Sequence, residues 1–153
     1  MAFIGRMLII IVALWLATMA AGIVWSIGLL GPSSTAFSGD IGDRVVFWGA
    51  AFVASGITAS LLFLPMLIAV VLAEVFSVRS LLIHAFGGVA LFLLAYQEAG
   101  FGRNGQESID HPPPPISREA QIAAGAGVVF GLTYWAIAGR KAGRWRERRD
   151  ASV

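Results

Sequence analysis

Residues 7–30 decide the fold: they read MLIIIVALWLATMAAGIVWSIGLL and contain no charged side chain. A helix of roughly 20 apolar residues spans the hydrocarbon core of a lipid bilayer. Because hydrocarbon offers no hydrogen-bond partners, the backbone inside it must satisfy its own donors and acceptors. A run of this length and composition therefore predicts a transmembrane helix.

Three further uncharged runs follow the first one, at residues 45–73, 80–97 and 120–139. Each run is long enough for one helical crossing, whereas transmembrane β-strands are about half as long and alternate in polarity. The second run exceeds the thickness of a bilayer, so we expect its helix to tilt, protrude or bend. The predicted fold class is all-α, an integral membrane bundle of four transmembrane helices.

The composition supports the same class. Of the 153 residues, 58% are hydrophobic and 13% are charged, whereas a soluble domain carries about 25% charged residues. A disordered chain would be poor in apolar residues and rich in charge, so disorder is excluded as well. The chain has no cysteine, which excludes disulfides, thiolate metal ligands and cysteine nucleophiles.

We expect a single membrane domain over residues 1–153. The expected helices cover about 4–30, 44–75, 79–98 and 118–140, with outer loops at 31–43 and 99–117 and a basic tail at 140–153. Asp43 should cap the start of the second helix and Ser117 that of the fourth. The first run is longer than the roughly 7–15 residues of a signal-peptide core, so we interpret it as a retained anchor.

The distribution of Lys and Arg predicts the orientation. Four spans put both termini on one side, together with Arg6, Arg79 and six basic residues of the tail. The opposite side has Arg44, Arg103 and Arg118. Since 1 + 1 + 6 = 8 basic residues face 3, the positive-inside rule predicts that both termini are cytoplasmic.

The stretch at residues 65–88 contains Leu72-Ala73-Glu74, Arg79-Ser80 and Gly87-Gly88. This stretch is similar to small inner-membrane proteins of bacteria. The resemblance implies the bacterial cell inner membrane as the location, and it implies no particular activity.

Glu74, Arg79 and His84 form a candidate polar cluster at the inner ends of the second and third helices. His84 lies well inside an apolar run, about 7 Å deeper than Arg79 at a rise of ~1.5 Å per residue. Ionisable residues inside a membrane are functional candidates. The plainer interpretation is an interhelical hydrogen bond for His84 and an interfacial ion pair between Glu74 and Arg79. No nucleophile, second acid or further metal ligand is close in sequence. We therefore predict no catalytic residue, no metal site and no cofactor.

Ala123, Gly127 and Gly131 lie four residues apart on one face of the fourth predicted helix. Lipid supplies no hydrophobic force between helices, so helix association depends on close backbone contact at faces of small residues. The face predicts packing within the bundle, or contact with a membrane-protein partner or a second copy of the chain. The proline loop at residues 112–115 is a second candidate contact surface.

The basic tail predicts contact with the lipid bilayer through anionic headgroups. Its basic residues are Arg140, Lys141, Arg144, Arg146, Arg148 and Arg149. A short tail with one aromatic residue is a weak basis for nucleic-acid binding, so we expect no nucleic-acid partner. Residues 100–105 match G-x-G-x-x-G, but a membrane helix precedes this motif where a dinucleotide-binding fold needs a strand. We therefore reject dinucleotide binding.

The leading hypothesis is an accessory or structural subunit of a larger membrane assembly, without a catalytic site. The first alternative is a small transporter or channel component, which would need a water-accessible cavity that reaches His84. The second alternative is a membrane enzyme that acts on lipid or quinone. Such an enzyme would need several polar groups that converge on one pocket.

Overall fold

The computed structural model describes residues 2–31, 39–99 and 116–143. These residues form α1 (Ala2–Leu30), α2 (Ile41–Val75), α3 (Leu81–Glu98), α4 (Arg118–Ile137) and the short 3-10 helix η1 (Gly139–Lys141), with no strand among them. All four α-helices are long and apolar enough to cross a membrane. This finding confirms the all-α class with four spans and indicates an integral membrane protein. The glycine motif at residues 100–105, the proline loop and the tail from residue 144 onward lie outside the described residues.

The start of α2 differs from the expectation. Asp40, not Asp43, is its N-cap, since the Asp40 carboxylate accepts a hydrogen bond from the Ile41 amide at 2.7 Å. The prediction that Asp43 is the cap was therefore wrong; Asp43 lies in the first turn, where its negative charge is favourable. The predicted cap of α4 is confirmed, because the Ser117 hydroxyl accepts a hydrogen bond from the Ala120 amide at 3.1 Å.

Local backbone geometry sets the other helix ends. Gly31 has φ +85°, the left-handed conformation that commonly ends a helix, and it follows the last residue of α1. α3 begins two residues later than expected because Ser80 has an extended backbone. α4 ends at Ile137 rather than at about residue 140, and the chain then forms η1 over Gly139–Lys141.

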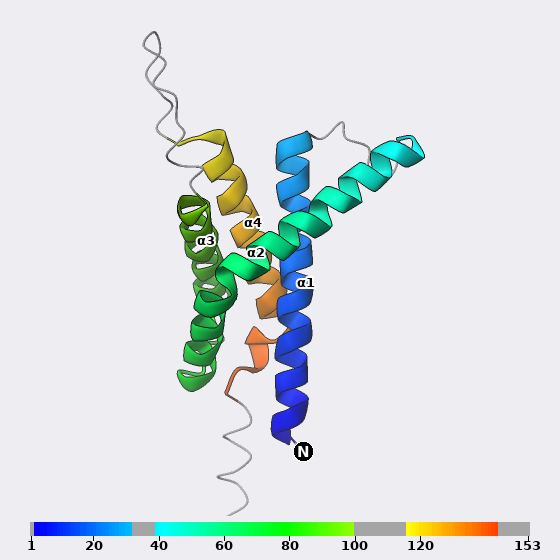
Figure 1. The fold of residues 1–153 in the computed structure, drawn as a ribbon. Helices are drawn as coiled ribbons and strands as arrows, with labels where there is room; N and C mark the ends of the chain where they lie inside the picture. The colour runs from blue at the N-terminus through cyan, green and yellow to red at the C-terminus, as the bar shows by residue number, and fades with distance from the viewer. Residues whose placement is uncertain (1, 32–38, 100–115, 144–153) are drawn as a thin grey trace, which may run out of the picture.

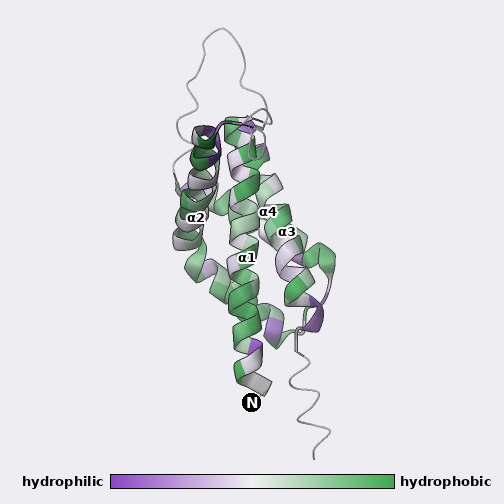
Figure 2. Ribbon diagram, turned by 90° about the vertical axis from the view of Figure 1, so that its right-hand side faces the viewer, coloured by the Kyte–Doolittle hydropathy of each residue, from purple (hydrophilic) through white to green (hydrophobic). Residues whose placement is uncertain are grey.

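The start of α1, the turn between α2 and α3, and the end of α4 lie at the same end of the molecule (Figure 1). Hydrophilic residues gather toward the ends of the helices, and hydrophobic residues cover most of their length (Figure 2). We call the first end the basic end, since its described charged residues are Arg6, Glu74, Arg79, Arg140 and Lys141. The described charged residues of the opposite end are Asp40, Asp43, Arg44, Glu98, Arg118 and Glu119. The two ends therefore carry opposite charge excesses within the described ranges.

Glycines bring the backbones of α3 and α4 into direct contact. A methyl group added at Gly88 would overlap the Gly127 carbonyl oxygen, and one added at Gly131 would overlap the His84 carbonyl oxygen. Ala123 is also buried within the chain. The small-residue face predicted for α4 therefore lies inside the bundle, where Gly127 and Gly131 contact α3.

α1 packs on both α4 and α2 through small residues. Ala13, Ala17 and Ala21 are fully buried and belong to one apolar core together with residues of α4. At Gly22, an added methyl group would overlap Ser55 of α2. This contact lets α2 cross closely over α1.

α2 leans across α1, and its first residues stand away from α3 and α4 (Figure 1). With 35 residues, at a rise of ~1.5 Å each, it is about 52 Å long, well beyond the ~30 Å hydrocarbon core of a bilayer. The helix continues through Pro65 without interruption. Many apolar side chains of α2 are exposed, among them Val45, Phe52, Ile57, Phe63, Leu64 and Ile68. In a membrane these side chains face lipid, where their exposure is favourable.

The contact between α3 and α4 predicts opposite effects at two neighbouring glycines. Gly127→Ala should destabilise the fold by about 1–3 kcal/mol, because the new methyl group has no room against the α3 backbone. Gly125→Ala is the matched control, since a methyl group there meets nothing within 4 Å. It should be neutral or stabilising by up to about 1 kcal/mol. Unfolding in mixed micelles, followed by circular dichroism, measures both; equal destabilisation by the two variants would contradict the described contact.

Candidate functional site

A buried ion pair joins the first and second helices at the basic end. The Arg6 guanidinium contacts the Glu74 carboxylate through two nitrogens, and its Nε donates to Oε1 at 3.0 Å. The side chains of Arg6 and Glu74 are only 10% and 13% exposed. A charge pair taken out of water is costly unless both partners are fully hydrogen-bonded.

The segment that follows α4 supplies one further hydrogen bond to each member of this pair. Arg6 Nη2 donates to the Ala138 carbonyl oxygen at 2.9 Å, and the Gly143 amide donates to Glu74 Oε2 at 3.0 Å. Gly143 has φ +75°, and an added methyl group there would overlap the Ser77 side chain. Both facts require a glycine at this position. The ion pair thereby holds α1, α2 and residues 138–143 together.

Arg79 connects the turn before α3 to the end of α4. Its Nε donates to the Ala142 carbonyl oxygen at 2.9 Å, and its own carbonyl oxygen accepts from Trp135 Nε1 at 2.8 Å. The Arg140 guanidinium lies over the Trp135 ring, 5.3 Å from its centroid. Arg140 and Lys141 are exposed. Two guanidinium groups and an indole therefore gather at one corner of the basic end.

His84 belongs to α3 and faces the segment that follows α4. Its Nδ1 lies 2.8 Å from the Ser80 carbonyl oxygen, which can only accept, so Nδ1 carries the hydrogen. Nε2 is buried and has no hydrogen-bond partner among the described residues. It lies over Gly139, where an added methyl group would come within 2.9 Å of it. The ring also stacks on Tyr134, with 5.8 Å between centroids.

The structure thus places Glu74, Arg79 and His84 at the same end of the molecule, but it gives each a different partner. Sequence reasoning paired Glu74 with Arg79, and the structure pairs Glu74 with Arg6. The sequence did contain a signal for this pair. Arg6 near the start of the first helix and Glu74 near the end of the second have opposite charges, and these two ends meet when consecutive helices run antiparallel. The partners from residues 138–143 had no signal, because they are backbone groups.

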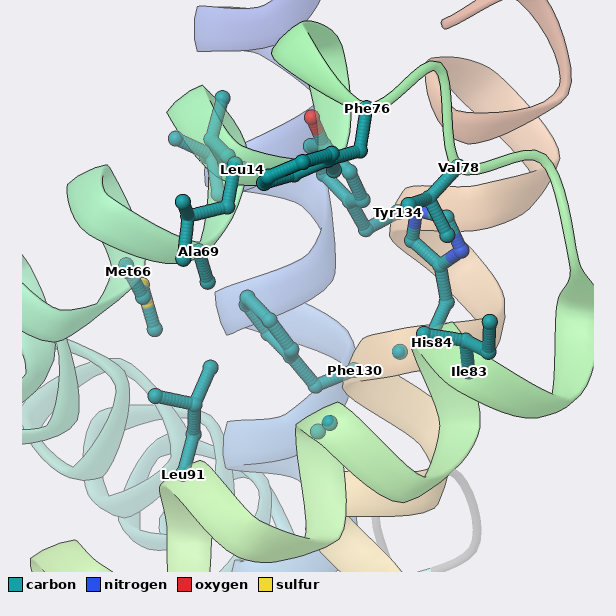
Figure 3. Close-up of a pocket in the computed structure, with 16 residues that line it drawn as sticks. Leu14, Met66, Ala69, Phe76, Val78, Ile83, His84, Leu91, Phe130 and Tyr134 are labelled. Carbon is teal, nitrogen blue, oxygen red and sulfur yellow. The ribbon is translucent and has the colours of Figure 1, made fainter.

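A cavity of about 270 Å³ lies under the turn between α2 and α3. We call it the turn cavity. Figure 3 shows Met66 and Ala69 of α2 across from Phe130 and Tyr134 of α4, with Leu91 toward one end. His84 is the one basic side chain in its lining. Leu72, Phe76 and Ile83 stand at its edge and are exposed, so the cavity opens between α2 and α3 toward the surrounding lipid.

A second cavity of about 310 Å³ lies farther along the same two helices. We call it the Ser26 cavity; its lining includes Trp25, Ser26, Ile57, Leu61, Phe92 and Tyr96. Ser26 is 2% exposed, and its hydroxyl has no hydrogen-bond partner within the described residues. Thr18, Ser55 and Ser60 instead donate their hydroxyl hydrogens to carbonyl oxygens of their own helices. Sequence reasoning did not single out either cavity, because neighbouring helices that diverge create both of them.

The lining residues decide what the two cavities can accommodate. Both cavities have mainly apolar walls, and the charged groups nearest the turn cavity are engaged in the ion pair and in backbone contacts. Within the described ranges, no group of three or more His, Asp or Glu side chains could hold a metal ion. The two cavities can accommodate apolar chains or side chains, and the basic side chains of the basic end can contact anions.

Removal of one member of the buried pair predicts a strong loss of stability. Glu74→Gln leaves the Arg6 charge buried without its carboxylate, so we expect destabilisation of about 3–5 kcal/mol. Glu119→Gln, an exposed carboxylate at the opposite end, is the control and should change little. The double variant Arg6→Met/Glu74→Gln should recover part of the loss. Unfolding free energies of the unmodified protein, Glu74→Gln, Arg6→Met and the double variant form the cycle, and additive single effects would refute the coupling.

Comparison of the chain with protein-family models, with curated proteins and with solved structures finds no match in any of the three.

Proposed function

We propose that this protein is a non-catalytic accessory subunit of a membrane assembly, and that it receives a transmembrane helix of a partner chain at the Ser26 cavity. The observation that carries the proposal is the buried Ser26 hydroxyl without a partner among the described groups. Such a hydroxyl costs about 1–3 kcal/mol unless something completes its hydrogen bond. Between membrane helices, serine and threonine hydroxyls commonly bond to the neighbouring helix.

The shape of the bundle supports the same occupant. α2 and α3 diverge from their connecting turn (Figure 1), and the Ser26 cavity lies between them on the side away from the turn, where α1 also lines it. Neighbouring helices pack with about 8–10 Å between their axes. A further helix therefore fits better at the Ser26 cavity, where α2 and α3 are farther apart, than close to the turn. Exposed apolar residues of α2, such as Ile57, line the cavity and face this space.

The two alternatives have less support. A path for ions near His84 would need polar groups along its wall, and the turn cavity is mainly apolar. A lipid- or quinone-acting enzyme would need a general acid or base aimed at a substrate. The Glu74 carboxylate is instead bound by Arg6 and by the Gly143 amide. We therefore rank both alternatives below the subunit.

We propose further that the assembly lies in a bacterial inner membrane, with both termini in the cytoplasm. The support is the charge excess of the basic end, where the described residues carry four basic side chains and one acidic. The described residues of the opposite end carry two basic and four acidic side chains. The positive-inside rule places an end like the basic end in the cytoplasm.

Reporter fusions test this orientation. Alkaline phosphatase, active only outside the cytoplasm, should be inactive when fused after Val153 and active when inserted after Gly39. Green fluorescent protein should give the reverse pattern at the same two positions. Phosphatase activity at the C-terminal fusion would contradict the proposed orientation.

Site-specific photo-crosslinking in cells tests the partner helix. A photoreactive residue at Ile57, 56% exposed in the Ser26 cavity, should give one defined protein adduct. The crosslinked peptide should map to a transmembrane segment of the partner. Phe52 is the control: it is 65% exposed on the same helix but lies about 140° around the helix axis, at ~100° per residue. Equal labelling from both positions, or lipid adducts alone, would refute the docking site.

Ser26→Ala separates a docking role from a purely structural one. Removing an unsatisfied hydroxyl should leave the isolated protein as stable as before, or more stable by about 1 kcal/mol. The same change should weaken the adduct from Ile57, because the partner helix loses its hydrogen bond. Thr18→Ala is the control, since the Thr18 hydroxyl bonds to its own helix, and it should leave the adduct unchanged. A Ser26→Ala adduct of full strength would argue against the proposed hydrogen bond.

A further inference from the structure

Residues of the turn cavity neighbour a group that we call the basic corner: the exposed Arg140 and Lys141, with Trp135, over whose ring the Arg140 guanidinium lies. The two features share neighbours in the chain. Val78 lines the turn cavity and precedes Arg79, and His84 lines it and lies against Gly139, which precedes Arg140. An amphiphile in the cavity would therefore bring its polar end close to these basic side chains.

The cavity itself fits a hydrocarbon chain. Its walls are mainly apolar, and the exposed residues Leu72, Phe76 and Ile83 open it toward the lipid between α2 and α3. A volume of about 270 Å³ lies just below the ~300–1,000 Å³ of ordinary ligand pockets. It suits part of one flexible chain better than a bulky ring system. In a bilayer, lipid acyl chains surround this opening.

The basic corner fits a phosphate group. Arg140 and Lys141 are exposed, and the Arg140 guanidinium is held over the ring of Trp135. Tryptophan is favoured at the level of lipid headgroups. Glu74, the acidic side chain described at this end, is engaged by Arg6. Charge complementarity therefore favours an anionic headgroup over a zwitterionic one.

We propose that the turn cavity and the basic corner together bind one anionic phospholipid. One acyl chain lies between α2 and α3 in the turn cavity, and the phosphate lies at Arg140 and Lys141. This site is separate from the Ser26 cavity and does not rest on the proposed partner helix. Since the lipid would fill the narrow part of the space between α2 and α3, it would also fix the angle at which α2 leaves the bundle.

Native mass spectrometry of the full-length protein in mild detergent tests this site. The probes are phosphatidylglycerol and phosphatidylcholine with identical acyl chains, each titrated separately. We expect one tightly bound phosphatidylglycerol, preferred over phosphatidylcholine by about tenfold or more. Equal binding of the two lipids would overturn the proposal.

Two sets of variants separate the chain from the headgroup. Gly87→Leu should abolish the tight phospholipid binding, because Gly87 lines the turn cavity and a side chain there enters open space. Gly56→Leu is the matched control: Gly56 also has open space around it and lines neither cavity. Arg140→Gln/Lys141→Gln should remove the preference for phosphatidylglycerol and retain chain binding. Tight binding to Gly87→Leu, or an unchanged preference in the double variant, would overturn the assignment.

Three further measurements distinguish the remaining explanations. Glycerol 1-phosphate should not displace phosphatidylglycerol, and displacement at millimolar concentration would show a free-phosphate site instead. Circular dichroism checks that Gly87→Leu keeps the native helix content. If this variant does not fold, Ala69→Leu replaces it in the binding experiment, because Ala69 lines the same cavity from α2. The photo-adduct from Ile57 should persist in Gly87→Leu. Failure of this lipid site and failure of the partner helix are therefore separate results.

Discussion

The architecture depends on where helix backbones can approach one another, because lipid provides no hydrophobic force to hold helices together. α3 and α4 meet through Gly88, Gly127 and Gly131, where a single added methyl group has no room. α1 joins them through fully buried alanines. α2 makes such a contact with α1, at Gly22, and then diverges from α3. The divergence leaves both cavities, so the places able to bind other molecules follow directly from the distribution of small residues.

The buried pair of Arg6 and Glu74 governs the basic end in a different way. Its attraction needs complete hydrogen bonding to outweigh the loss of hydration. The Ala138 carbonyl and the Gly143 amide add one hydrogen bond to each partner, which ties the segment after α4 to the first two helices. The turn between α2 and α3 is held against the same segment through Arg79 and Ala142. These contacts fix the segment after α4, which carries Arg140 and Lys141, against the turn between α2 and α3.

The two cavities differ in the groups beside them, and this difference separates the two proposals. The Ser26 cavity contains a buried hydroxyl without a described partner, which favours a helix that carries a polar side chain. His84 of the turn cavity lies against Gly139, which precedes the exposed Arg140 beside Trp135, and this neighbourhood favours an anionic lipid. A subunit of this kind would combine a lipid that fixes the angle of α2 with a partner that occupies the wider space. The angle of α2 would then depend both on the lipids of the membrane and on the presence of the partner chain.

The sequence by itself determined the class of this protein, because four long uncharged runs have one stable solution in hydrocarbon, the helix. It also determined the cap at Ser117 and the close-packing character of Gly127 and Gly131, since both depend on local residue types at fixed spacing. Only the tertiary structure decided that Glu74 pairs with Arg6, at a sequence distance of 68 residues. It alone decided that Ser26 is buried without a described partner and that α2 leaves two cavities beside α3. Those features depend on the angles between the packed helices. The pattern of residues along one helix does not specify these angles, because they are set by contacts with the other helices.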